Sequence, residues 1–298
     1  MSIDISDLSK LKQIYDENGY VLIKNVFSEA ECDDMKEEIE KIVDKLDLSQ
    51  HPKTIFDTYD DQRHVDTYFL DSASKVSFFY EEGALAKDGT LTVPKDQALN
   101  KIGHALHWLN PVFKKYTFDQ RICNIVRSLG FQNPHIVQSM YIFKQPKIGG
   151  AVTDHIDATF LQSDPPENLF GIWIAIDEAS QENGCLWFIP GSHQGPHPGY
   201  RFVRTFSTDP NEKLLIFEGK KPTYDQSKFL PVPVPKGSMV LINGLVAHKS
   251  EPNTSDKSRH AYTVHVAEMV ERKKWHERNW LQETEDYKFP ALYTSKSD

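Results

Sequence analysis

The feature that most constrains this fold is a series of short runs rich in β-branched and aromatic residues. The runs cover residues 136–144, 169–177, 185–192, 239–245 and 261–269. Side chains of this kind fit the pleated surface of a strand. Several antiparallel-type strands separated by polar turns are typical of a sandwich or a jelly roll. We therefore predict a mainly β structure from about residue 135 onward.

The first part of the chain carries a helical pattern instead. Ser28 precedes Glu31 by three residues, which is the pattern of a capping box, and apolar residues then recur at helical spacing. Residues 117–130 repeat the pattern. We predict that residues 1–134 are mainly helical and pack on the β-rich part. Both parts are assigned to a single domain over residues 1–298.

A long connection over residues 196–236 lacks a clear period and contains Pro, Gly and Lys. Irregular segments of this length in a compact domain are usually functional loops or disordered. We predict a mobile lid that covers the functional site and carries substrate selectivity. Trp108 and Trp187, in contrast, are interpreted as ordinary core residues.

Charge and cysteine content narrow the class of protein. The chain has 34 basic and 43 acidic residues, a formal net charge of −9. This balance disfavours binding to duplex nucleic acid or to an anionic membrane surface. The three cysteines are far apart and form no CxxC pair, which favours a reducing compartment. With no long apolar run and no signal-like opening segment, we expect a cytoplasmic protein. No obligate protein partner is evident from the sequence.

Two strand-like segments, one that ends at residues 154–157 and the apolar run 239–248, end in side chains that bind metals. His155 and Asp157 are two residues apart, and alternate side chains of a strand face the same way. His248 closes another apolar run and is the candidate third ligand. Two imidazoles and one carboxylate form a facial set whose open positions suit a non-haem Fe(II) oxygenase. His193 and His265 are interpreted as structural, since neither has a carboxylate partner at strand spacing.

Longer motifs around these residues resemble one known family, the phytanoyl-CoA dioxygenase family, over about residues 15–293. The motifs lie at residues 100–107, 138–146, 155–157, 171–193, 248–250 and 279–282, together with Arg259. The resemblance implies a mainly β fold with flanking helices, namely a double-stranded β-helix or cupin-like jelly roll. It also implies an oxidoreductase that uses Fe(II) and 2-oxoglutarate.

The resemblance assigns roles within the site. His155, Asp157 and His248 are expected to hold the iron and form the catalytic set. Arg259 is expected to clamp the far carboxylate of 2-oxoglutarate, because a guanidinium offers two parallel donors. Ile156 is a departure, because the family commonly has Gln at this position. The other residues expected to line the co-substrate pocket are Lys101, Met140, Trp173 and Ser250.

The expected reaction hydroxylates an unidentified small molecule with dioxygen and converts 2-oxoglutarate to succinate and CO2, with ascorbate as a candidate reductant. A coenzyme A thioester is not expected to be required, because residues 196–236 hold no cluster of cations for its phosphates. One alternative is a sensor or scaffold that binds metal and 2-oxoglutarate without catalysis. A second, a zinc hydrolase, is disfavoured because no glutamate is placed as a general base.

Overall fold

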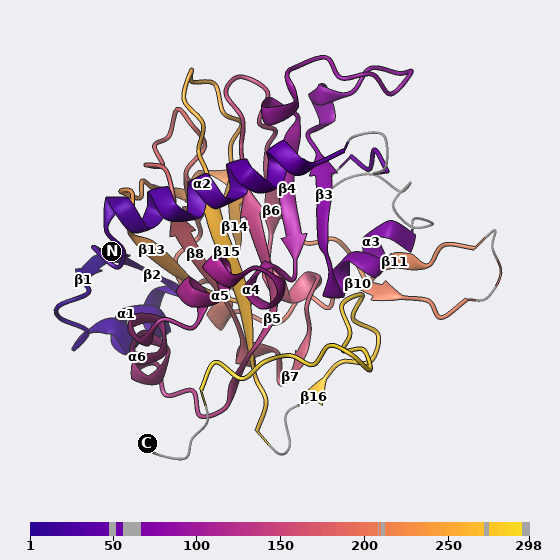
Figure 1. Cartoon of the computed structure of the whole chain (residues 1–298). Helices are drawn as coiled ribbons and strands as arrows, with labels where there is room; N and C mark the ends of the chain where they lie inside the picture. Colours follow the sequence, from indigo (N-terminus) through magenta and orange to yellow (C-terminus); the bar gives the residue numbers. More distant parts are fainter. Residues whose placement is uncertain (48–51, 56–66, 208, 210–211, 271–273, 294–298) are drawn as a thin grey trace.

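Two β-sheets form the centre of the molecule (Figure 1). The structure, a computed structural model, describes residues 1–47, 52–55, 67–207, 209, 212–270 and 274–293. The large sheet has the order β1-β2-β13-β8-β15-β5-β4-β3 and the small sheet β12-β9-β14-β6. The strands of the large sheet are β1 (Ser2–Asp4), β2 (Tyr20–Lys24), β3 (Val76–Tyr80), β4 (Leu99–His104), β5 (Pro134–Ile142), β8 (Leu169–Ala175), β13 (Met239–Asn243) and β15 (Ala261–Glu268). Those of the small sheet are β6 (Val152–His155), β9 (Leu186–Phe188), β12 (Leu230–Val232) and β14 (His248–Ser250).

Eight of these strands wind between the two sheets. From β5 onward the chain alternates between large and small sheet, except that β9 and β12 lie together in the small one. Apart from the parallel pair β1–β2, the neighbours within the two sheets are antiparallel. This winding is a double-stranded β-helix, so the predicted jelly roll is confirmed. A separate short pair joins β7 (Ser163–Asp164) to β16 (Lys274–Trp275).

The N-terminal part differs from the expected, mainly helical layer. It supplies both edges of the large sheet, because β2 pairs with β13 while β4 pairs with β5 and carries β3 outside it. Each of these strands is only five or six residues long. β2 and β4 pair with strands more than thirty residues away in the chain, and a local periodicity cannot reveal such pairings.

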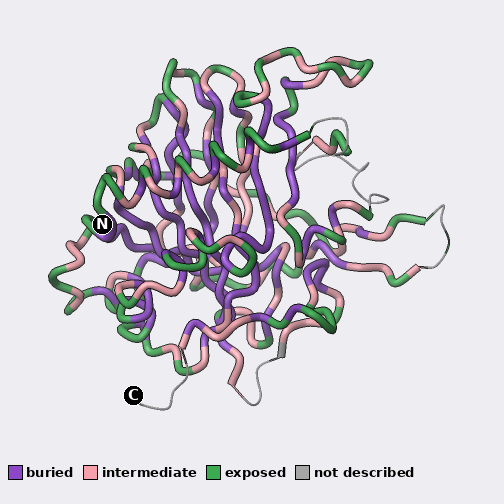
Figure 2. The backbone as a smooth tube through the Cα atoms, viewed as in Figure 1, coloured by how far each residue is buried: buried purple, intermediate pink, exposed green. Residues whose placement is uncertain are grey.

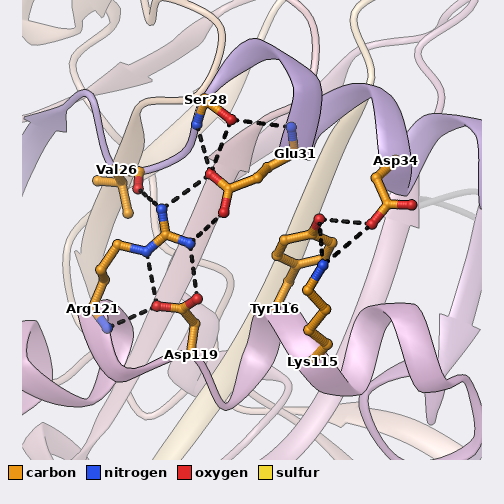
Figure 3. Close-up of polar contacts among 8 residues, drawn as sticks. All are labelled: Val26, Ser28, Glu31, Asp34, Lys115, Tyr116, Asp119 and Arg121. Carbon is orange, nitrogen blue, oxygen red and sulfur yellow. Dashed lines mark hydrogen bonds and ion pairs between the residues drawn. The ribbon is translucent and has the colours of Figure 1, made fainter.

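Helices cover the outer face of the large sheet, and α2 lies across its strands (Figure 1). The predicted capping box of α2 is confirmed, because Glu31 N donates to Ser28 Oγ and Ser28 N donates to Glu31 Oε2 (Figure 3). None of the helices in the described part of the chain combines the length and apolar character needed to cross a membrane. The helices are α1 (Leu11–Asn18), α2 (Glu29–Lys45), α3 (Thr67–Asp71), α4 (Leu106–Leu109), α5 (Pro111–Thr117) and α6 (Gln120–Ser128).

Alternation along the central strands separates the outer core from the interior. In β8, Ile172 and Ile174 pack under the helices, whereas Gly171 and Trp173 face the space between the sheets. Figure 2 shows the central strands buried beneath an exposed outer layer. The fold therefore points every second side chain of β8 into the interior.

The segment 196–236 is more ordered than expected. It contains a hairpin of β10 (Arg201–Arg204) and β11 (Leu215–Glu218), and it ends in β12 of the small sheet. Residues 208, 210 and 211 at the hairpin tip lie outside the described part. Within the hairpin, Phe202, Val203 and Leu215 are buried. The weak sequence period therefore missed a hairpin, whose apolar pairs pack into the core. Outside the three strands and one short 3-10 helix (Gln226–Lys228), the described residues of the segment are mostly irregular, and its role as a lid stays a prediction.

The two tryptophans expected in the core have different surroundings. Trp187 is partly buried and packs against two apolar clusters. Trp108 is 39 % exposed, and the Lys114 ammonium lies 4.4 Å from the centre of its ring. The core interpretation is wrong for Trp108, because its short helix α4 leaves the side chain at the surface.

Candidate functional site

Three side chains meet at one end of the small sheet. His155 ends β6 and is the cross-strand partner of His248, which begins β14. Asp157 follows in a short 3-10 helix (Asp157–Thr159). Its Oδ1 atom lies 3.7 Å from His155 Nε2 and 3.6 Å from His248 Nε2. The potential ligand atoms all lie within 4.8 Å of one another, so one metal ion can contact all three.

Backbone carbonyls set the orientation of both imidazoles. His155 Nδ1 lies 2.6 Å from the Thr153 carbonyl oxygen, and His248 Nδ1 lies 3.0 Å from that of Val246. A carbonyl oxygen accepts only, so each Nδ1 carries the hydrogen and each Nε2 keeps its lone pair. Those two lone pairs are available on the side of Asp157, as metal ligation requires.

The electrostatics favour the protonation states that bind metal. Burial alone would raise the pKa of Asp157, but the imidazoles of His248, His265 and His155 outweigh it and hold that pKa well below the usual value. Burial, with the neighbouring His155, lowers the pKa of His248 to about 4. The carboxylate is therefore ionised and His248 neutral around pH 7.

The three side chains open into a cavity of about 390 Å³ between the sheets, and Arg259 lies in the same cavity. Arg259 is only 2 % exposed, and its guanidinium carbon lies 5.2 Å from the centre of the Trp173 ring. Burial lowers its pKa to about 10, so the side chain remains a cation near pH 7. Its Nε and Nη1 atoms make no hydrogen bond within the described residues. A buried cation with unused donors is the complement of a carboxylate.

The structure brings the other predicted pocket residues to this cavity. Lys101, Met140, Trp173 and Ser250 all line it. Lys101 is 5 % exposed, with its Nζ atom 3.6 Å from the sulfur of Met140. Ser250 Oγ donates to the carbonyl of Gly184 at 3.0 Å. Each of these side chains can therefore contact a molecule held between Arg259 and the three potential ligands.

Ile156 has a different environment from its two neighbours. It is 2 % exposed and packs in an apolar cluster with Leu161, Leu169 and Ala247. It does not line the cavity. The middle position of the triplet therefore points into the core, as strand alternation requires.

The strand register arranges the inward-facing residues in successive layers, each made of one residue from β15, one from β8 and one from β5. Ala261 of β15 lies opposite Ala175 of β8 and Ile142 of β5, and two residues later Thr263 lies opposite Trp173 and Met140. The next inward-facing layer holds His265, Gly171 and Gln138. Arg259 precedes the first layer, and Asp157 contacts the third. A carboxylate held by Arg259 thus lies at one end of the layers and the potential metal ligands at the other.

Sequence reasoning missed the members of this third layer. His265 Nε2 lies 3.3 Å from Asp157 Oδ2, and Gln138 Nε2 lies 2.9 Å from His265 Nδ1. The interpretation of His265 as no more than structural is therefore incomplete. Strand alternation could have found both residues, because His265 is six residues after Arg259, and Gln138 is two before Met140.

An aromatic wall was also missed. Phe160 lies next to His155, with ring centres 5.7 Å apart, and the wall continues through the β10–β11 hairpin. The ring centres of Phe202 and Phe217, both in the hairpin, are 4.8 Å apart. The wall, which we define as Phe69, Phe160, Phe202, Phe217 and Trp280, lines the cavity. These residues come from four separate segments, so no local sequence pattern connects them.

Comparison with known proteins agrees with these features. The family model described as phytanoyl-CoA dioxygenase matches residues 15–261. The chain is 61 % identical over 285 residues to phytanoyl-CoA dioxygenase domain-containing protein 1 homolog of Caenorhabditis elegans, covering 95 % of this chain and 98 % of the relative. It is 46 % identical to phytanoyl-CoA dioxygenase domain-containing protein 1 of Danio rerio over 287 residues, covering 95 % and 97 %.

A solved structure supports the fold. The epimerase SnoN, described in complex with Fe3+, alpha ketoglutarate and nogalamycin RO, superimposes with a TM-score of 0.62. The match covers 96 % of this chain and 93 % of SnoN at 14 % identity. Both the family model and the near end-to-end relatives lead to one conclusion: the chain belongs to the phytanoyl-CoA dioxygenase family, a family of 2-oxoglutarate-dependent non-haem iron oxygenases.

Proposed function

We propose that this chain is an Fe(II)- and 2-oxoglutarate-dependent dioxygenase that hydroxylates a small molecule. His155, Asp157 and His248 would hold the iron, and Arg259 would anchor the co-substrate. The observation that carries this proposal is the combination, in one cavity, of a His-Asp-His set with a buried arginine whose donors are unused. The bound Fe3+ and alpha ketoglutarate named for the SnoN structure support the same pairing.

The residues present fit both groups. Two neutral imidazoles and one carboxylate are suitable ligands for Fe(II) and leave open positions for other molecules. The unpaired Arg259 donors suit a dicarboxylate that reaches from the ligand set toward the first layer of the cavity. When bound, iron and 2-oxoglutarate supply the oxidation, in which one atom of dioxygen enters a substrate C–H bond and the other enters succinate, with release of CO2.

The protein's own contribution is binding, orientation and exclusion of water. Trp173 lies beside the Arg259 guanidinium and limits its movement, so the two donors are oriented before the co-substrate arrives. Lys101 adds a second buried cation to the same cavity. Buried charges act strongly because little solvent screens them.

The aromatic wall points to a substrate with an apolar body. Its rings begin next to His155, which is where a C–H bond must lie for oxidation. Arg204, a cation of the same hairpin, donates to the carbonyl of Trp280, so its Nε and Nη2 donors are used within the protein and do not call for an anionic substrate. Gln138 Oε1 is a buried acceptor without a partner among the described residues, and it suits a hydroxyl or N–H group on the substrate.

The test is a turnover assay of the purified chain with Fe(II), 2-oxoglutarate and ¹⁸O₂ across a panel of metabolites. We expect succinate that forms in proportion to a hydroxylated product carrying one labelled oxygen atom. Asp157→Ala is the matched control and should give neither product. Tight 2-oxoglutarate binding without substrate-coupled succinate across the panel would instead identify a sensor or scaffold and overturn the catalytic proposal.

A further inference from the structure

The two oxygens of Asp157 have different neighbours. Oδ1 lies within 3.7 Å of both His155 Nε2 and His248 Nε2. Oδ2 lies 3.3 Å from His265 Nε2. Oδ1 is therefore the oxygen that can bind a metal together with the two imidazoles. Oδ2 contacts His265 instead.

The direction of the contacts follows from the chemistry of the groups. An ionised carboxylate only accepts, so His265 must present a hydrogen at Nε2. The other ring nitrogen, Nδ1, then accepts from the Gln138 side-chain amide at 2.9 Å. Both side chains are buried, His265 at 7 % and Gln138 at 5 % exposure. This chain of contacts holds the imidazole at a defined angle against Asp157.

Gly171 leaves the space that this arrangement needs. A Cβ atom at Gly171 would lie 3.3 Å from Asp157 Oδ2 and 3.7 Å from His265 Cδ2. The first distance is tighter than ordinary van der Waals contact. A side chain on β8 at this position would press the carboxylate away from its contact with His265.

We propose that His265, oriented by Gln138, is a positioning residue that occupies Asp157 Oδ2 and reserves Oδ1 for the metal. The inference rests on the metal site of the proposed function. Carboxylates bind metals through one oxygen or through both. If Oδ2 were free, it could take one of the open positions that the co-substrate and dioxygen require. His265 thereby keeps Asp157 a ligand through one oxygen only.

The test measures binding of Mn(II), a metal that does not start the oxidation, by calorimetry on the full chain. Loss of a group that orients a ligand costs roughly 10- to 100-fold in metal affinity. We expect a loss of this size in His265→Leu and a smaller one in Gln138→Leu. His265→Gln should retain most of the affinity, because its side-chain amide offers a donor near the position of Nε2.

A second readout follows the open positions directly. In the Mn(II)-loaded protein, His265→Leu should weaken 2-oxoglutarate more than His265→Gln does, because a freed Oδ2 competes for the metal. Mn(II) and 2-oxoglutarate affinities that are both unchanged in a folded His265→Leu variant would overturn the proposal. Equal losses in His265→Leu and His265→Gln would also overturn it, because a donor would then be irrelevant.

His107 provides a matched control. It is also buried, and its two nitrogens contact Ser139 Oγ and the Tyr287 hydroxyl, each at 2.8 Å. His107→Leu should lower the melting temperature and leave Mn(II) affinity unchanged. The reverse pattern is expected for His265→Leu, whose metal-free melting temperature should change little. A His265→Leu variant that only loses stability would show a structural role and contradict the proposal.

These measurements separate the proposal from the proposed function. Mn(II) binding by the wild type, and its loss in Asp157→Ala, establish the metal site without any turnover. The role of His265 can then fail while the metal site stands, and the hydroxylase assignment can fail while the role of His265 stands.

Discussion

Two arginines in this chain have opposite surroundings. Arg121, in α6, uses all its side-chain donors: Nε bonds to Asp119, Nη1 to the Val26 carbonyl and to Glu31, and Nη2 to both carboxylates (Figure 3). Arg259 is more deeply buried, yet its Nε and Nη1 make no hydrogen bond among the described residues. The donors of the first arginine are all used within the protein, whereas two donor atoms of the second are available to a ligand.

Under the proposed function, this difference separates an arginine that stabilises the fold from an arginine that binds the co-substrate. The Arg121 guanidinium joins α6 to the start of α2 and lies 4.5 Å from the centre of the Phe27 ring. Its contacts disappear when the protein unfolds, so they stabilise the fold. An unpaired buried cation destabilises the fold instead, and is explained by a ligand that pairs with it. Substitutions in the two regions should therefore have opposite consequences.

The largest effect is expected at the metal site. Asp157→Ala should reduce substrate-coupled succinate formation on the order of 1000-fold or more, because the metal contributes several kcal/mol to the transition state. The melting temperature of the metal-free protein should fall while the protein stays folded, because the substitution removes the favourable contacts of the carboxylate with the neighbouring imidazoles. Initial rates and thermal denaturation of the same preparation check both points. Turnover near the wild-type rate would contradict the ligand assignment.

Arg259→Ala should weaken 2-oxoglutarate by about 10- to 1000-fold, because a charge-assisted pair of hydrogen bonds contributes a few kcal/mol. Arg259→Lys should restore only part of the affinity, since an ammonium cannot present two parallel donors. Lys101→Ala should show a smaller loss of the same kind. Calorimetric titration of Mn(II)-loaded protein measures the affinities. An unchanged value in Arg259→Ala would remove the basis of the comparison between the two arginines.

Arg121→Ala should show the converse behaviour. We expect a loss of about 2 kcal/mol in the free energy of unfolding, since several charged hydrogen bonds are removed from a partly exposed position. The affinity for 2-oxoglutarate should stay within about 2-fold of wild type, because the guanidinium lies outside the cavity. Urea denaturation and the same titration provide the two numbers. A large change in ligand affinity with unchanged stability would reverse the roles assigned here.

The smallest expected effect is a pH dependence of stability. Hydrogen bonding to Arg121 is the main cause that lowers the pKa of Glu31 from 4.5 to about 2. A carboxyl whose pKa is lower in the folded state stabilises the protein above its unfolded value and loses that contribution as the pH falls. The wild type should therefore lose more stability than Glu31→Gln between about pH 5 and pH 3. Parallel pH dependences in urea denaturation would show that this ion pair contributes nothing.

Elements with a local signal could be predicted from the amino-acid sequence. The capping box at Ser28 and Glu31 requires only three residues of spacing, and the β-branched runs identify β5, β8, β13 and β15 within a few residues. His155 and Asp157 could be paired because strand alternation places residues two apart on one side. His248 was the candidate third ligand because it closes another apolar run, and the family resemblance then assigned Arg259 its role; no local period connects either residue to the first pair.

Which strands are neighbours follows from the three-dimensional fold and not from any local pattern. The fold placed β2 and β4 in the large sheet, converted residues 201–218 into a hairpin, and brought His265 within 3.3 Å of Asp157. The pairings of β2 and β4 and the contact of His265 with Asp157 join segments that are distant in sequence, and the register of such strands depends on packing between the two sheets. The alternation of side chains along a strand shows which face of the sheet a residue lies on. It does not show which residue of another strand lies opposite, because that depends on the tertiary fold. For that reason strand alternation can show that His265 faces the cavity, whereas its contact with Asp157 is known only from the structure.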